Sequence, residues 1–434
     1  MRAANLPEPA SASVGLPSAV QAGDPPARRY ALFRGAVARE IARCSEVGLD
    51  TAALLFFPLL VVLPRGIAAL VSAAGLCAAG FVLAAGRSRL TPLLAVASIL
   101  GALVLWGTAS ALWSVNPMRS LVVAARLAGL FATGLALAAS AGLIEAPRRL
   151  TLLLLIGMAL GIAMVTIELA TGGGLSSVLS DRAYRPTRLN QASIAFSLLV
   201  FPASAVLPCR GRRLVAAGLA ALTAASVYAL AGTAAKVLLL AGLAAGLLLY
   251  RARPVVAWIV IVISIAAIIG APLTFARLEQ LPGLGEVADS VKISAGHRLL
   301  IWSFAGDRIA ERPLTGWGLD SSRAIPGGDD PIRPGENWMP LHPHNAALQV
   351  WLELGAPGAV LFALLSAIAW GALARVTWPA LFAAAAGASL TNAFLGCFVT
   401  YGVWQEWWVG TLSFSLFLTL VMARVASECR PATT

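Results

Sequence analysis

Long apolar runs separated by short polar segments make up most of this sequence. A helix needs roughly 20 mostly apolar residues to cross the hydrocarbon core of a membrane, and the recurring runs have about that length. They predict about twelve spanning helices, nine before the longest polar segment and three after it: 48–64, 66–85, 92–113, 120–142, 149–171, 191–208, 213–231, 233–250, 255–275, 345–372, 377–399 and 404–425.

Polar segments divide the chain into five parts. Residues 1–45 are rich in Ala, Pro and Ser, and we expect them to form a largely disordered cytoplasmic tail. Residues 46–275 carry the first nine predicted helices, and residues 345–425 carry the last three. Between them, residues 276–344 form the long hydrophilic loop, and residues 426–434 form a second cytoplasmic tail.

Arginines fall mainly in every second loop. The loops on the side of the two termini contain Arg87, Arg89, Arg148, Arg149, Arg210, Arg212, Arg213, Arg251, Arg253, Arg375, Arg424 and Arg430. The short loops between them contain little beyond Arg65 and Arg119. Because basic residues mark the cytoplasmic side of spanning helices, we expect both termini in the cytoplasm and the long loop on the opposite side.

The long loop has helical character in its middle. The run H-R-L-L-I-W-S-F-A-G-D-R-I-A-E-R, which begins at His297, places Leu300, Ile301, Phe304 and Ile309 on one face. Pro313 ends this run, and a section rich in glycine and proline follows between residues 327 and 335. The pattern predicts a short helix along the membrane surface, followed by a flexible flap at about residues 320–340.

Composition supports an all-α integral membrane protein. Hydrophobic residues make up 59% of the chain and charged residues only 12%, whereas a soluble domain carries about 25% charge. The net charge of +12 does not indicate nucleic-acid binding, because the arginines fall in small groups and no basic helix is present. The five cysteines lack CxxC spacing, so a disulfide framework is not expected.

All three histidines of the chain lie in the long loop. His344 stands where the loop meets an apolar helix, with Asn345 as the expected N-cap. An imidazole at the mouth of a membrane cavity can act as a general base near neutral pH; alternatively, His344 only caps the helix. His342 is less favoured, because Pro343 is expected to turn the two side chains apart. Glu353, nine residues after His344, is expected to face inward.

A zinc site is the competing interpretation of the histidines. His342 and His344 form an H-x-H pair, and His297 could supply a third ligand. Zinc sites need three or four protein ligands in fixed geometry, and the spacing permits such a set without specifying it. A G-x-x-x-x-G-K-[ST] loop is missing from the sequence, which argues against nucleotide hydrolysis. We therefore expect neither a metal nor another cofactor.

Arginines gather in the two sizeable outer loops. Arg182, Arg185 and Arg188 precede the helix that begins at about residue 191, and Arg298 follows His297. Lys236, near the start of a later helix, could reach the same outer pocket. Arginine at a membrane interface often only pairs with lipid phosphates. Guanidinium groups in two clusters would also suit a ligand that carries a pyrophosphate.

One motif of the chain resembles a known family. His344-Asn345 is followed by nine residues, A-A-L-Q-V-W-L-E-L, and then by Gly355-Ala356-Pro357-Gly358. This H-N-x9-G-x-x-G arrangement resembles the O-antigen ligases and the related O-antigen polymerases and bacterial O-oligosaccharyltransferases. The R-x-x-x-L element of that family has a near match in Arg298-Leu-Leu-Ile-Trp302, with Trp in place of Leu.

The resemblance implies an O-antigen ligase, a metal-independent inverting glycosyltransferase on the periplasmic side of the bacterial inner membrane. Its donor is O-antigen on undecaprenyl pyrophosphate, and its acceptor is a sugar hydroxyl of lipid A–core. His344 would then be the general base, while Arg188 and Arg298 would bind the pyrophosphate. Arg185 is the second choice to Arg188, and Arg182 and Lys236 are less favoured. Asn345, His342, His297 and Trp302 would play supporting roles.

Three alternatives stay open at this point. An O-antigen polymerase would use a second lipid-linked glycan as the acceptor, and a protein O-oligosaccharyltransferase would use a protein hydroxyl. A lipid-linked oligosaccharide transporter would use the same arginines for binding without needing His344. All of these proteins would contact membrane lipids.

Overall fold

The computed structural model of the chain describes residues 26–85, 93–180, 186–208 and 211–428. Its α-helices are α1 (Pro26–Val62), α2 (Ile67–Ala85), α3 (Leu94–Ala109), α4 (Pro117–Ser140), α5 (Pro147–Ala170), α6 (Gly174–Ser180), α7 (Asn190–Val206), α8 (Arg213–Ala229), α9 (Thr233–Ile269), α10 (Leu284–Val291), α11 (Ile293–Glu311), α12 (Ala346–Arg375), α13 (Ala380–Val399) and α14 (Glu406–Ser427). A small antiparallel pair, β1 (Pro331–Arg333) and β2 (Glu336–Asn337), completes the fold.

The helices confirm an all-α integral membrane protein. Within the described ranges, ten helices are long and apolar enough to cross a membrane, and Arg213–Ala229 is a shorter apolar helix. Large apolar side chains point outward from them, such as Leu105 (72% exposed), Leu247 (61%) and Val262 (67%). So much exposed apolar surface suits helices that are surrounded by lipid.

One of the ten helices, α9, consists of two arms. A straight helix of its 37 residues would be roughly 55 Å long, far more than a membrane requires. Ala252 interrupts it with φ −145° and ψ 50°. On the first arm, Leu238 packs next to Gly396 near the end of α13, and Leu249 packs next to Gly387 nearer its start. The first arm therefore runs antiparallel to α13.

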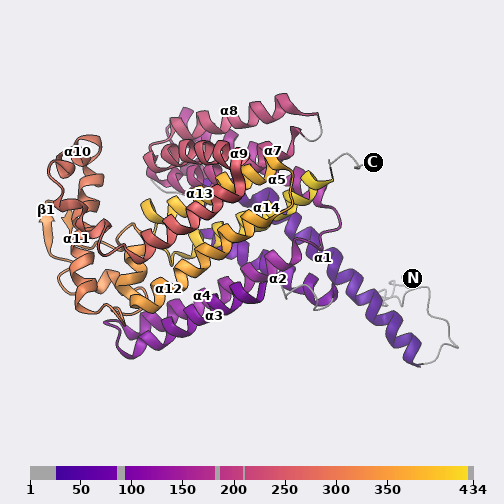
Figure 1. Cartoon of the computed structure of the whole chain (residues 1–434). Coiled ribbons are helices and arrows are strands. Elements are labelled where there is room, and N and C mark those ends of the chain that lie inside the picture. Colours follow the sequence, from indigo (N-terminus) through magenta and orange to yellow (C-terminus); the bar gives the residue numbers. More distant parts are fainter. Residues whose placement is uncertain (1–25, 86–92, 181–185, 209–210, 429–434) are drawn as a thin grey trace, which may run out of the picture.

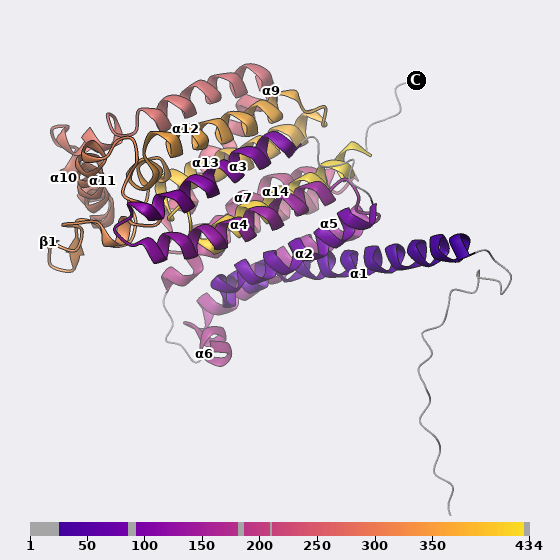
Figure 2. The ribbon, with the colours of Figure 1, turned by 90° about the horizontal axis from the view of Figure 1, so that it is seen from below.

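The second arm of α9 runs antiparallel to α12. Ser264 is hydrogen-bonded to Ser366 in the middle of α12, and the carbonyl of Ile268 accepts a hydrogen bond from Trp351 near its start. Since α12 and α13 are joined by a short connection and run in opposite directions, the two arms do so as well (Figures 1 and 2). With α8 and both arms counted, the described part of the chain contains the twelve apolar helical segments that the sequence predicts.

The long loop lies at one end of the helix bundle. Helices α10 and α11 and strand β1 gather there, whereas the start of α1 and the end of α14 lie toward the other end (Figures 1 and 2). This arrangement agrees with the expected placement of both termini on one side of the membrane and the loop on the other. That the loop faces the periplasm stays a prediction.

Aromatic side chains of α1, α7 and α14 form the centre of the bundle. Phe56, Phe57, Phe196 and Phe414 are fully buried. Phe57 stacks on Phe196 with 4.5 Å between ring centroids, and Phe56 lies 5.1 Å from Phe414. Helices from the first and last thirds of the chain therefore share one core.

Two expected boundaries are wrong. Helix α1 begins at Pro26, so the predicted disordered tail is helical from that residue on, and residues 1–25 lie outside the described part. Adding residues to an existing helix is easy, and residues 27–45 contain no proline. The long loop begins at Gly270 rather than at residue 276, because Gly270 caps α9 and Pro272 follows it.

Candidate active site

The chain turns sharply at the junction of the long loop and α12. Asn345 is the N-cap of α12, and its side-chain oxygen accepts a hydrogen bond from the backbone N–H of Leu348 at 3.2 Å, as expected. His344 has φ +56°, a left-handed conformation that residues other than glycine adopt rarely. Such a conformation costs about 1–2 kcal/mol, so the surrounding contacts must stabilise it.

The His344 ring is fixed at one nitrogen. Its Nδ1 lies 2.6 Å from the backbone oxygen of Thr400, which can only accept, so Nδ1 carries the hydrogen and Nε2 keeps its lone pair. Among the described residues, Nε2 has no hydrogen-bond partner. Burial lowers the pKa of His344 to about 4, and the positive charge of Arg298 adds to this effect. The ring is therefore neutral at physiological pH.

His342 lies directly against His344. The two ring centroids are 4.2 Å apart, so the expectation that Pro343 turns these side chains apart is wrong. The left-handed φ of His344 folds the chain back, and Trp302 holds the turn by donating its indole N–H to the Pro343 oxygen at 2.7 Å. The two histidines therefore form a pair.

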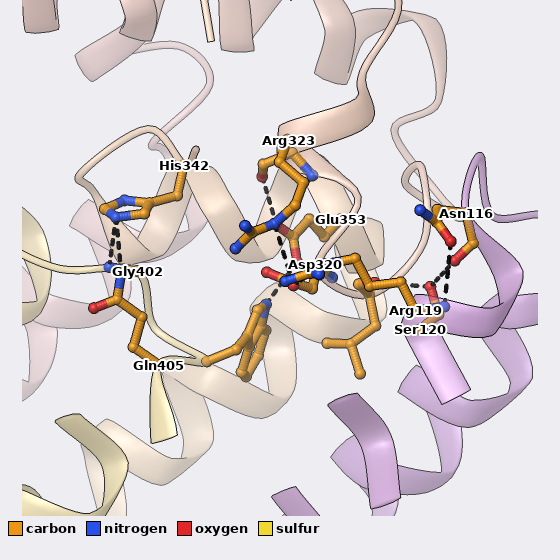
Figure 3. A network of polar contacts seen from close by, with 12 residues as sticks. Asn116, Arg119, Ser120, Asp320, Arg323, His342, Glu353, Gly402 and Gln405 are labelled. Carbon is orange, nitrogen blue, oxygen red and sulfur yellow. Dashed lines mark hydrogen bonds and ion pairs between the residues drawn. The ribbon is translucent and has the colours of Figure 1, made fainter. Parts of the chain in front are cut away.

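Amide N–H groups surround the His342 ring. The His344 N–H faces Nδ1, and the Gly402 N–H and the Gln405 side-chain amide face Nε2, each at 3.2 Å (Figure 3). A neutral imidazole has one N–H and one lone pair, so it can accept on only one of these sides, and a second ring proton would remove that acceptor. The imidazole is only 4% exposed, and burial lowers the pKa of His342 to about 3. His342 is thus a neutral ring that supports the backbone of its neighbour.

Helix α11 supplies a cation to this site. Arg298 donates to the backbone oxygen of Val399 at 2.9 Å, and no carboxylate of the described residues lies within ion-pair distance of it. Burial lowers the pKa of this guanidinium, and the nearby Tyr401 opposes the shift. Trp302, one turn later on α11, replaces the Leu of the R-x-x-x-L element and supplies the N–H that holds Pro343.

His297 connects α11 to the small β hairpin. Its Nε2 lies 2.8 Å from the backbone oxygen of Asn337, and its Nδ1 lies 3.7 Å from a carboxylate oxygen of Glu336. Its charge acts on the pKa of His344, so it lies near the histidine pair without being part of it. No group of three or more His, Cys, Asp or Glu side chains within the described ranges has a metal-binding arrangement.

The other predicted cations are not in this cluster. Arg188 lies half-buried in a 3-10 turn, Pro186–Leu189, just before α7. The Lys236 ammonium lies 5.9 Å from the ring centroid of Tyr228. No hydrogen bond or ion pair joins either residue to the histidine pair in the part of the chain that the structure describes. Arg182 and Arg185 lie outside the described residues.

The first glycine of the H-N-x9-G-x-x-G motif, Gly355, is required by the backbone of α12. Gly355 interrupts α12 with φ +62° and ψ −160°, a conformation almost confined to glycine. A Cβ atom there would lie 2.4 Å from the Leu314 oxygen. The interruption lets the loop and a tryptophan bond the opened helix backbone: Trp317 N to Leu352 O (2.9 Å), Gly318 N to Glu353 O (2.8 Å), Trp106 Nε1 to Leu354 O (2.8 Å) and Ala356 N to Pro313 O (2.9 Å).

Glu353 is the centre of a buried polar network. Its side chain faces inward, as expected, and is 0% exposed. The carboxylate accepts from Asp320 N (2.5 Å), Trp404 Nε1 (2.6 Å), Gln349 Nε2 (3.1 Å), and the N–H and hydroxyl of Ser322. Gln349 in turn accepts a hydrogen bond from the Val403 N–H. Glu353 therefore links α12 to the long loop and, through Trp404, to residues 400–405, which contact both histidines.

Asp320 extends this network to α4 and to a second cation. Arg119 donates to the Asp320 carboxylate at 2.6 Å, and Arg323 lies 3.5 Å from the same oxygen (Figure 3). Asp320, Ser321 and Ser322 are buried, so the first part of the expected flap is anchored. Asp320 and Arg323 carry no recognisable motif in the sequence, and the contact of Asp320 with Arg119 joins residues that are 201 positions apart.

The described residues thus hold a neutral imidazole with one available nitrogen beside a guanidinium that lacks a carboxylate partner. The first can accept a proton, and the second can bind an anion. Fold and site together define a multi-pass membrane protein with a candidate site for an anionic ligand.

Comparison with known proteins agrees with this class. Residues 214–363, which include Arg298, His344, Gly355 and Gly358, match the family model described as O-Antigen ligase. A protein of Rickettsia conorii named "Putative polysaccharide ligase RC0486" is 34% identical over 168 residues, which cover 37% of this chain and 41% of that protein. "Putative polysaccharide ligase RP358" of Rickettsia prowazekii is 35% identical over 153 residues, or 34% of this chain and 38% of that protein.

These matches confirm the resemblance that the motifs carry. Residues 214–363 are similar to the O-antigen ligase family over this part of the chain. The chain spans less than half of the length of the relatives that it matches.

Proposed function

We propose that this protein is an O-antigen ligase of the bacterial inner membrane, with its active site on the periplasmic side. It would transfer O-antigen from undecaprenyl pyrophosphate to a sugar hydroxyl of lipid A–core. The observation that carries this proposal is the geometry of His344. Its Nδ1 is hydrogen-bonded to a carbonyl and its Nε2 is available, and Arg298, which no described carboxylate neutralises, lies nearby.

The reaction would be a direct displacement at the anomeric carbon of the donor sugar. The acceptor oxygen forms a bond to this carbon while the bond from the carbon to the pyrophosphate oxygen breaks. The hydroxyl proton moves to Nε2 of His344, and undecaprenyl pyrophosphate leaves with the electron pair. Attack from the face opposite the leaving group inverts the anomeric centre. The proton then passes to water, which regenerates the neutral ring.

Arginines would stabilise the leaving group. A pyrophosphate is a weak base, so it needs no general acid, but its growing negative charge needs fixed cations. Arg298 is assigned this role because its guanidinium lies beside the histidine pair. Arg188 is the second proposed pyrophosphate ligand, with Arg185 as the alternative and Arg182 and Lys236 less favoured. The pyrophosphate of the lipid donor would contact both Arg298 and Arg188.

An apolar cavity supports a lipid-linked donor. It has a volume of about 410 Å³ and lies among α3, α4, α12, α13 and α14. Val403 and Trp404 line this cavity, and both also belong to the polar network around Glu353. A prenyl chain in this cavity would keep its pyrophosphate near Arg298.

An acceptor assay tests the function. Purified protein is mixed with a glycan on undecaprenyl pyrophosphate and with lipid A–core, a second lipid-linked glycan, or an acceptor protein. We expect the glycan to move to lipid A–core. Elongated lipid-linked glycan would indicate an O-antigen polymerase, and a modified protein would indicate a protein O-oligosaccharyltransferase. Movement of the donor across vesicles without any transfer would indicate a transporter.

A further inference from the structure

Arg323 is a second guanidinium whose charge is only partly neutralised. It lies in a 3-10 turn, Ser322–Ala324, and its side chain is 32% exposed. Its Nε lies 3.5 Å from Asp320 Oδ2, but Arg119 already donates to that oxygen at 2.6 Å. No hydrogen bond joins the Arg323 side chain to any described residue, and its buried Nε has no hydrogen-bond partner. One carboxylate thus serves two guanidinium groups.

The turn that carries Arg323 is held firmly in place. Glu353 binds the backbone and hydroxyl of Ser322 and the backbone of Asp320. The Ser321 and Ser322 side chains on this turn are fully buried. The backbone that carries this cation is therefore in place before any ligand arrives, which lowers the cost of binding.

Arg323 and Arg298 both lie near the histidine pair. The charges of both arginines act on His342, and Arg298 also acts on His344. In Figure 3, Arg323 lies between Asp320 and His342. The two arginines come from different elements, η8 (Ser322–Ala324) and α11. Both arginine charges that act on His342 are positive, and this favours an anion beside the neutral histidine pair.

We propose that Arg323 is a further pyrophosphate-binding residue, which acts together with Arg298 at the histidine pair. This inference rests on the proposed function, because it concerns the same lipid pyrophosphate. A pyrophosphate has two phosphoryl groups, and two guanidinium groups can each bind one of them. Arg119 has a supporting role: it occupies Asp320, so the N–H groups of Arg323 remain available for the ligand.

Two substitutions of Arg323 and one matched control test this assignment. Arg323→Gln removes the charge and Arg323→Lys keeps it. Arg308→Gln is the control, because Arg308 is 29% exposed, lies in the same loop and pairs with Glu311 at 2.7 Å. The measurements are the KM of the lipid-linked donor, the KM of lipid A–core, and inhibition by undecaprenyl pyrophosphate and by inorganic pyrophosphate.

We expect Arg323→Gln to raise the donor KM and both inhibition constants about 10- to 100-fold, the range for hydrogen bonds to charged groups. Arg323→Lys should restore part of this loss, and Arg308→Gln should behave as the wild type. The acceptor KM should not change. If Arg323→Gln only lowers the thermal unfolding midpoint, Arg323→Lys still tests the inference, because it retains a cation next to Asp320.

Two results would overturn the inference. One is a donor KM and inhibition constants that do not change in an Arg323→Gln protein that transfers glycan. The other is a raised acceptor KM alone, which would assign Arg323 to a phosphate of lipid A–core. If the wild type transfers no glycan, the proposed function fails instead. Binding of undecaprenyl pyrophosphate to the wild type and to Arg323→Gln then decides on Arg323 separately.

Discussion

The backbone of His344 determines where its ring points. The left-handed φ places the ring against His342 and brings Nδ1 to the Thr400 oxygen. A residue that only capped the helix would not need this conformation, since Asn345 already supplies the cap. Strained residues often occur where function requires a particular geometry, and this one carries the proposed base.

The pH dependence of transfer follows from the low pKa of His344. Burial is the largest cause, and it favours the neutral ring down to a pKa of about 4. The kcat/KM of an enzyme reports groups of the free protein, so it should stay constant from neutral pH to about pH 5 and fall below that. Rates measured after return to neutral pH control for unfolding. An acid limb near 6.5, the ordinary value for histidine, would contradict this geometry.

The charge of Arg298 contributes to this low pKa. Arg298→Gln removes a positive charge that disfavours the imidazolium, so the acid limb of the pH profile should move to higher pH. The same variant should weaken donor binding, because the pyrophosphate loses a cation. Donor affinity that does not change would count against the assigned role of Arg298.

His342 should matter less than His344. His342→Ala removes the ring that packs on His344 and that faces the N–H groups of His344 and Gly402. We expect kcat to fall about 10-fold, because the base is misplaced rather than lost, whereas His344→Ala should lose at least about 100-fold. Equal losses in the two variants would show that the assignment of the base to one ring is wrong.

Metal independence is the prediction that separates a base from a zinc ligand. Transfer should persist after dialysis against a strong chelator, because the proposed step uses only His344 and the arginines. If transfer stops after dialysis and returns with added zinc, the histidine-base mechanism is wrong.

At the scale of elements, Gly355 determines the shape of α12. The interrupted helix exposes carbonyls that bind the loop around Trp317 and Gly318, and Glu353 then binds Asp320 and Ser322. The first part of α12, residues 346–354, is thus hydrogen-bonded both to the long loop and to residues 403–404, next to the residues that contact the histidines. Gly355 of the G-x-x-G motif therefore acts through the backbone of α12.

Gly355→Ala should lower stability strongly. The Cβ would lie 2.4 Å from the Leu314 oxygen, at a positive φ. Gly283→Ala is the matched control, because Gly283 also has a positive φ but nothing lies within 4 Å of its Cβ position. The control should cost about 1–2 kcal/mol, and Gly355→Ala should cost clearly more. Equal shifts of the thermal unfolding midpoint would show that the close approach at Gly355 is unimportant.

The elements also show what the sequence could predict. Apolar length located the helices, and the polar stretch at Arg251 and Arg253 separated the two arms of α9. The H-N-x9-G-x-x-G spacing identified His344 and its cap. Asp320 and Arg119 could not be found in this way, since 201 positions separate them. The pairing of His342 with His344 was missed because a single positive φ, invisible in the sequence, reverses the expected turn.

For the whole molecule, the arrangement of the helices predicts which residues are accessible from each side of the membrane. Asp329, in the long loop, and Arg212, before α8, are both exposed. In a cysteine-free background, a membrane-impermeant maleimide should label Asp329→Cys in intact spheroplasts. It should label Arg212→Cys only after the membrane is permeabilised. The reverse pattern would invert the topology and place the histidine pair in the cytoplasm.

The central claim is that His344 is the base of a glycosyl transfer. The most direct test measures transfer from a glycan on undecaprenyl pyrophosphate to lipid A–core by purified wild type and His344→Ala, with donor affinity measured in parallel. The account predicts that the variant loses at least about 100-fold in kcat while its donor affinity stays at the wild-type value. Transfer by His344→Ala at the wild-type rate would contradict it.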